Sequence, residues 1–187
     1  PGSPEGEADV IVGGPPCQPF SQAGRQRGPA DDRNGFPAFL DAVDRMRPRI
    51  AVIENVRGLL FKNRAYLDDA VAKLEAMGYS VDARLLDASQ YGVPQKRQRV
   101  FVVASRVGGE WPEAVVERPV TAGAALTSLP DEPDENHTYL TESMDRYIAA
   151  YEAKSKCARP RDLHFDKPAR TLTCRNLAGA TADMHRI

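Results

Sequence analysis

The chain has 187 residues, of which 42% are hydrophobic and 27% are charged, and its formal net charge is -1. These proportions are typical of a globular protein with one domain, or one domain plus an appendage, and they exclude disorder as the default. The near-neutral charge excludes a strongly basic nucleic-acid binder, so any such binding must come from a local patch.

The cysteines are few and widely spaced. There are three of them, Cys17, Cys157 and Cys174, and no CxxC spacing occurs, which argues against a disulfide framework and against a zinc site. We therefore expect a reducing, cytoplasmic setting and no metal. The sequence also lacks a bilayer-spanning apolar run and a signal-peptide pattern, so no membrane partner is expected.

The first predicted element is a short buried strand over residues 10–12, where three β-branched residues precede Gly13 and Gly14. Residues 18–35 have no periodicity and are rich in glycine, proline and arginine. This composition predicts a long irregular loop of the kind that forms lids and binding elements. Apolar residues at helical spacing then predict a helix over 36–47.

Strand and helix patterns alternate along the next stretch of the chain. We predict strand, helix, strand and strand, in that order, over residues 49–55, 66–77, 79–88 and 97–105. Such alternation indicates an α/β fold built on a parallel sheet. Beyond residue 106 one clear helix pattern remains, over 142–153, so we divide the chain into segments 1–106 and 107–187.

Polar clusters lie at the boundaries of three predicted strands. They are Cys17 and Gln18, Glu54 and Asn55, and the run from Gln95 to Arg99. The carboxyl ends of adjacent parallel strands converge on one crevice, so Cys17 and Glu54 are expected to face each other. The arginines precede their strand, and they reach the same edge only if that strand runs antiparallel to its neighbours.

The stretches GGPPCQPFSQAG, ENVRGLL and YGVPQKRQRVFVVA resemble three ordered motifs of the DNA (cytosine-5)-methyltransferase family. The resemblance covers residues 8–106, and it implies part of a Rossmann-like methyltransferase sheet that lacks its first strands. Residues 107–187 would then begin a target-recognition region. The implied reaction is methyl transfer from S-adenosylmethionine to carbon 5 of a cytosine that is flipped out of double-stranded DNA.

The resemblance also implies residue roles. Cys17 would add to carbon 6 of the ring, and Glu54, as a carboxylic acid, would protonate or hydrogen-bond ring nitrogen 3. Arg97 and Arg99 would face the same pocket, although an arginine beside Glu54 opposes its protonation unless the base lies between them. Further site residues are expected in three groups. They are Asn55 and Gln95 in support, Pro16, Gln18 and Phe36 at the cofactor, and Ser21, Arg25, Arg27 and Arg33 at the DNA.

Most of the family's cofactor site lies upstream of the Cys17 motif. We therefore expect an incomplete S-adenosylmethionine site and no methyl transfer by this chain alone. A truncation, a fragment and one subunit of a split enzyme with a complementary chain stay open as explanations. Two other functions also stay open, namely an RNA cytosine methyltransferase and a non-catalytic DNA-binding or assembly module.

Overall fold

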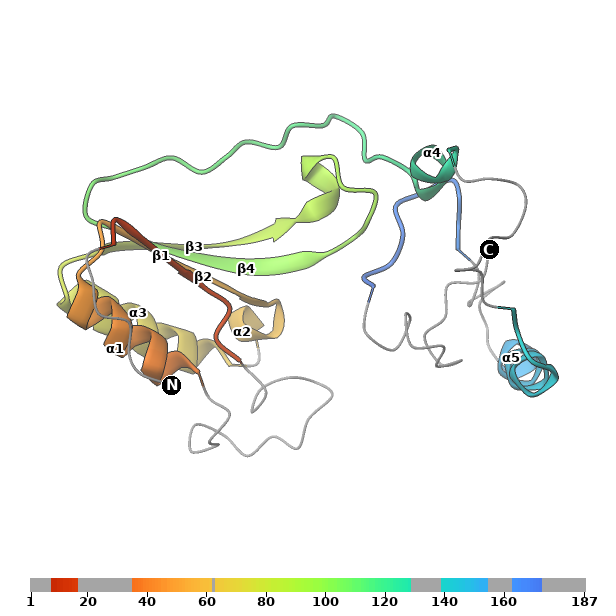
Figure 1. Cartoon of the computed structure of the whole chain (residues 1–187), viewed down its shortest axis with the longest axis horizontal. Coiled ribbons are helices and arrows are strands. Elements are labelled where there is room, and N and C mark those ends of the chain that lie inside the picture. Colours follow the sequence, from red (N-terminus) through yellow and green to blue (C-terminus); the bar gives the residue numbers. More distant parts are fainter. Residues whose placement is uncertain (1–7, 17–34, 62, 129–138, 155–162, 173–187) are drawn as a thin grey trace. The chain divides into compact units, whose positions relative to one another are not determined.

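The structure is a computed structural model that describes residues 8–16, 35–61, 63–128, 139–154 and 163–172. The chain divides into two compact units, one formed by 1–87 with 98–113 and the other by 88–97 with 114–187. The first unit holds all the strands of the sheet, and the elements described in the second unit are helical (Figure 1).

A four-stranded mixed sheet in the order β1-β2-β4-β3 forms the centre of the first unit. Its strands are β1 (Val10–Gly13), β2 (Ile50–Val56), β3 (Ser80–Asp87) and β4 (Gln98–Ser105). β1 is parallel to β2, whereas β4 is antiparallel to both β2 and β3. The predicted α/β class is confirmed, but the prediction of a parallel sheet is wrong for β4, which has the antiparallel orientation that the arginines required.

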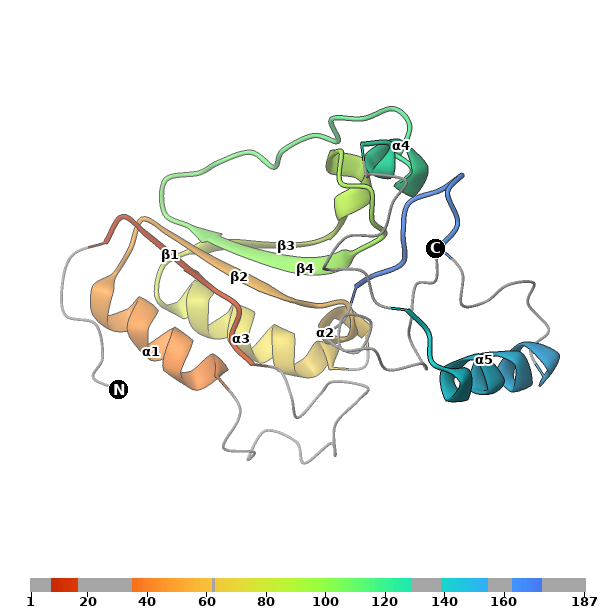
Figure 2. The same ribbon diagram turned by 45° about the vertical axis from the view of Figure 1, so that its right-hand side comes forward.

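Helices line one face of this sheet. They are α1 (Phe36–Met46), α2 (Gly58–Phe61) and α3 (Arg64–Ala76), and both ribbon views show them on the same side (Figures 1 and 2). Alternate residues of β2 and β4, such as Ile53 and Val102, are buried in one hydrophobic core with the apolar stripes of α1 and α3. No helix in the described ranges is long and apolar enough to cross a membrane.

β1 is buried on one side only. Ile11 packs against the core, whereas Val10 and Val12 are 50% and 70% exposed. The expectation of a fully buried first strand is therefore wrong. Successive strand residues point to opposite faces, and the described helices that follow β1 cover only the face that Ile11 meets.

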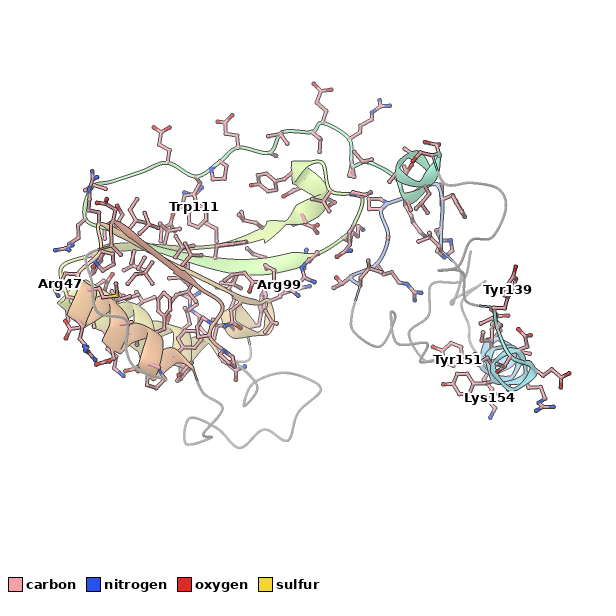
Figure 3. All side chains as sticks on the ribbon, in the orientation of Figure 1. Arg47, Arg99, Trp111, Tyr139, Tyr151 and Lys154 are labelled. Carbon is pink, nitrogen blue, oxygen red and sulfur yellow. The ribbon has the colours of Figure 1, made fainter. Side chains whose placement is uncertain are left out.

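The other face of the sheet carries a cluster around Trp111 (Figure 3). The Trp111 Nε1 donates to Asp82 Oδ2 at 2.7 Å, and the Arg84 guanidinium carbon lies 4.9 Å from a ring centroid of the indole. Burial would raise the pKa of Asp82, but the hydrogen bonds from Trp111 and Arg84 outweigh it and hold the pKa below its usual value. The cluster fastens the segment after β4 to β3.

The second unit contains the 3₁₀ helix η2 (Ala88–Tyr91), α4 (Ala122–Leu126) and α5 (Glu142–Lys154). The predicted helix over 142–153 is confirmed by α5. Backbone pairing joins distant segments within this unit: Gln95 and Ala169 form a parallel bridge, and Gly123 N donates to Phe165 O at 3.0 Å. The segment around Ala169 is thereby paired with the loop that precedes β4.

Candidate active site

Two glycines allow the end of β1 and the turn after it to pack closely against α1 and the residue before it. A Cβ atom added to Gly13 would lie 2.7 Å from Phe39 Cε2, and one added to Gly35 would lie 2.5 Å from Pro16 Cδ. Contacts this short leave no room for a side chain, so both positions require glycine as placed. Gly35 also donates its backbone N–H to Pro16 O at 3.3 Å. The start of α1 therefore fixes the residue that immediately precedes Cys17.

Asn55 ties the same turn to β2. Its side chain is buried, its Nδ2 donates to Pro15 O at 3.1 Å, and its Oδ1 accepts from Val56 N at 2.9 Å. Both ends of the amide are thus used, as a buried polar group requires. The contact joins two segments that lie 40 residues apart in the sequence.

Glu54 and Arg99 form an ion pair at the end of the sheet where β2 finishes and β4 begins (Figure 3). Glu54 is opposite Phe101 in the antiparallel register, so Arg99 is its diagonal neighbour on the same face. The Arg99 Nε lies 2.8 Å from Glu54 Oε1. The two side chains are 21% and 37% exposed for Arg99 and Glu54, so the pair is reachable from solvent.

The carboxylate of Glu54 also touches the turn after β1. A Cβ atom built on Gly14 would lie 3.4 Å from Glu54 Oε2, which places the turn directly beside the second carboxylate oxygen of Glu54. Arg99 makes a further bond, from Nη1 to the Gln98 carbonyl at 2.8 Å. The ends of β1, β2 and β4 therefore meet around one carboxylate, which is a suitable place for acid catalysis on a ring.

A family model described as C-5 cytosine-specific DNA methylase matches residues 3–162, which is most of the chain. The chain belongs to this family. Among curated relatives, the Type II methyltransferase M.AplI of Arthrospira platensis is 56% identical over 180 residues, which cover 96% of this chain and 52% of that protein. M.NgoMIV of Neisseria gonorrhoeae, also a Type II methyltransferase, is 41% identical and is covered to 41% of its length.

Solved structures of other methyltransferases have a similar fold. A mutant of Spodoptera frugiperda DNMT2 superimposes with a TM-score of 0.61 at 24% identity, over 92% of this chain and 52% of that one. A prophage-encoded DNA modification methyltransferase (E. coli) gives a TM-score of 0.52 at 29% identity, over 71% and 38%. The methylase-family chain thus spans about half, or less, of the length of these proteins.

The structure brings only some of the predicted site residues together. It brings Glu54, Asn55 and Arg99 together with the turn that contains Pro16. Arg97 and Gln95 belong to the second unit, where Gln95 pairs with Ala169. The remaining predicted residues at the nucleophile, cofactor and DNA positions lie outside the described residues: Cys17, Gln18, Ser21, Arg25, Arg27 and Arg33.

Two features of this edge were not predicted from the sequence. Phe36, which we expected at the cofactor, is 1% exposed, and its ring packs edge to face on Tyr66 at a centroid distance of 5.2 Å. Gly35 was treated as part of a loop, although the pair Asn34-Gly35 just before a helix pattern is a turn signal that could have singled it out. In the described ranges no three His, Cys, Asp or Glu side chains gather as metal ligands.

Proposed function

We propose that this chain is the catalytic segment of an enzyme that methylates carbon 5 of cytosine in double-stranded DNA. The family match supports the reaction, and the relatives named as Type II methyltransferases support a DNA substrate within a restriction-modification pair. Such a substrate would place the protein at the nucleoid. The observation that carries the proposal is the Glu54–Arg99 pair, which lies against the turn leading to Cys17.

The chemistry begins at carbon 6. The thiolate of Cys17 forms a bond to this carbon while the π pair between carbons 5 and 6 moves into the bond between carbons 4 and 5. The π pair between carbon 4 and nitrogen 3 then moves onto nitrogen 3, which takes a proton from Glu54 in its acid form. Carbon 5 has become an enamine carbon and can accept a methyl group. Loss of the carbon 5 proton and departure of the thiolate then restore the double bond between carbons 5 and 6, and the proton on nitrogen 3 returns to Glu54.

The geometry gives Glu54 and Arg99 separable tasks. Arg99 Nε lies 2.8 Å from Glu54 Oε1, and Glu54 Oε2 lies on the Gly14 side, where it would meet ring nitrogen 3. When the base lies between the two side chains, Arg99 would donate to the exocyclic oxygen of the base. Asn55 keeps the turn before Cys17 and the end of β2 in a constant relation through its bond to Pro15 O.

A base within a stacked duplex exposes neither carbon 6 nor nitrogen 3 to these groups, so the target cytosine must be flipped out at a cost of a few kcal/mol. We propose that the segment over 19–35 closes over the extruded base, with Ser21, Arg25, Arg27 and Arg33 at the phosphates. The three arginines in this segment supply local positive charge for phosphates in a chain whose formal net charge is -1.

The methyl donor needs more than the described residues provide. S-adenosylmethionine supplies the methyl group when it is bound. Of the residues assigned to it, Phe36 is buried, Gln18 lies outside the described residues, and Pro16 alone presents surface. These residues do not make a donor pocket, and we derive no step through the donor. We therefore propose that the isolated chain binds it too weakly for transfer. Calorimetry that detects micromolar binding of S-adenosylmethionine by the isolated chain would contradict this part.

The reaction is tested with a duplex that carries 5-fluorocytosine at the target position, because fluorine cannot leave carbon 5 as a proton does. The protein expressed from the full reading frame around this chain should form a covalent adduct that Cys17→Ser abolishes. Glu54→Gln should slow methyl transfer by orders of magnitude while duplex binding changes only a few fold. Glu75→Gln, an exposed change of the same type in α3, is the matched control and should have no effect.

Four outcomes would contradict the proposal. An adduct that survives Cys17→Ser would remove the nucleophile, and an unchanged rate in Glu54→Gln would remove the acid. Methylation of a hairpin RNA in preference to the duplex would transfer the same chemistry to RNA. Duplex binding without an adduct in any arm would favour the non-catalytic module.

A further inference from the structure

Arg57 is the first residue after β2, and two contacts hold its side chain. Its guanidinium carbon lies 4.9 Å from the ring centroid of Phe61 in α2, and its Nη1 donates to Gln98 Oε1 at 3.1 Å. Stacking on an aromatic face and a hydrogen bond from one nitrogen together restrict where the remaining N–H groups can point. The side chain is therefore pre-organised although it is exposed.

The position of Arg57 relates it to the active-site edge. The last pair in the register of β2 and β4 is Val56 with Arg99, so Arg57 and Gln98 continue the same ladder by one residue. Gln98 directly precedes Arg99, and the Gln98 carbonyl accepts a hydrogen bond from the Arg99 guanidinium at 2.8 Å. Arg57 thus lies one step beyond the Glu54–Arg99 pair at the same end of the sheet.

The charge of Arg57 is not neutralised by its partner. Gln98 is an amide, and in the described part of the chain no carboxylate forms an ion pair with Arg57. Other exposed arginines of this unit differ, since Arg45 and Arg64 each pair with an aspartate four residues away. Phe61, on which Arg57 lies, is itself 58% exposed. An oriented, uncompensated guanidinium on an exposed ring is well matched to an oxyanion.

We propose that Arg57, positioned by Phe61 and Gln98, binds a backbone phosphate of the nucleic-acid strand that carries the target base. The inference rests on the proposed function, because it identifies a positioning contact for the substrate of that same edge. A phosphate held here fixes the strand one residue beyond the Glu54–Arg99 pair. Arg57 touches no reacting atom in this assignment, and its effect is on where the strand lies.

The test measures duplex affinity against salt concentration, with the protein expressed from the full reading frame. Loss of one phosphate contact should reduce the slope of log affinity against log salt by about 0.9. Between 50 and 200 mM salt the affinity of Arg57→Gln should therefore fall about 3.5-fold less than that of the unmodified protein. Gln98→Glu should have a similar effect, because it places a carboxylate where the amide now accepts from Arg57. Arg45→Gln, on α1, is the matched control and should keep the full slope.

A full slope in both Arg57→Gln and Gln98→Glu would overturn the phosphate assignment. Both sites are at the surface or half-buried, so a folding defect is not expected, and circular dichroism checks this. The Glu54→Gln variant separates the two proposals. If Glu54→Gln loses methyl transfer while Arg57→Gln keeps the full salt slope, only the assignment of Arg57 is rejected. Absence of any duplex binding by the unmodified protein rejects both.

Discussion

Replacement of Gly35 by alanine tests how tightly the turn before Cys17 is held. The backbone of Gly35 has φ -84° and ψ -7°, which alanine adopts without strain. The whole effect of the substitution must therefore come from the new methyl group. That group would lie 2.5 Å from Pro16 Cδ, 3.1 Å from Pro16 N and 3.2 Å from Pro15 Cα.

The size of the destabilisation depends on which of the neighbouring atoms can move away from the new methyl group. Two of the three neighbouring atoms are backbone, and Pro15 is also held by the Asn55 amide, so the methyl group displaces the turn instead of a flexible side-chain end. Overpacking of this kind costs about 1–3 kcal/mol. The lower entropy of an alanine in the unfolded chain returns about 0.4–1 kcal/mol. We expect a net loss of about 1–2 kcal/mol in the free energy of unfolding.

Gly58→Ala is the matched control, because no atom lies within 4 Å of a Cβ added there and Gly58 begins α2. This change should stabilise the chain by about 0.4–1 kcal/mol. Urea unfolding should then give midpoints that move in opposite directions, with Gly35→Ala lower by about 0.5–1 M. Equal midpoints, or a higher midpoint for Gly35→Ala, would show that the turn is not packed as described.

Three further changes have defined outcomes. Asn55→Asp removes the donor to Pro15 O and should lower the free energy of unfolding by about 1–3 kcal/mol at neutral pH. Part of this loss should be regained in acid, because a protonated carboxyl can donate. Urea midpoints at neutral and acidic pH measure both effects. Trp111→Phe removes a hydrogen bond that lowers the pKa of Asp82, so the pH-dependent part of its deficit in urea midpoint should be largest above about pH 4 and should disappear in acid, where Asp82 is protonated in both proteins. Tyr79→Phe removes the 2.7 Å donor to Pro48 O, to which Arg106 Nη2 still donates at 3.1 Å, and should lower the melting temperature by a few degrees through loss of one buried hydrogen bond.

Sequence periodicity predicted the long elements well because each buries one side. The stripes of α1, α3 and α5 and the apolar runs of β2 and β4 are long enough to show a period. α2 and α4 have four and five residues, which is too short for any period to appear, and they were missed. β1 was predicted as buried because three apolar residues in a row do not reveal that only one face will be covered.

Prediction of the site depends on the register of the strands as well as on the sequence. That Arg99 reaches Glu54 depends on an antiparallel β4, which the sequence presented only as a condition. The contact between Asn55 and Pro15 could be anticipated from the order of the motifs, but its use of the Pro15 carbonyl could not. The packing of Gly35 on Pro16 depends on how α1 approaches the sheet, and residues that are distant in sequence decide that approach.

The exposed side of β1 has a practical consequence for handling the protein. β1 is at one end of the strand order, and beyond it no further strand is paired in the described ranges. An edge strand with two exposed valines offers backbone groups and apolar side chains to any other chain in solution. Samples of residues 1–187 purified by themselves should therefore self-associate through this strand at high concentration, and Val12→Lys should reduce that association.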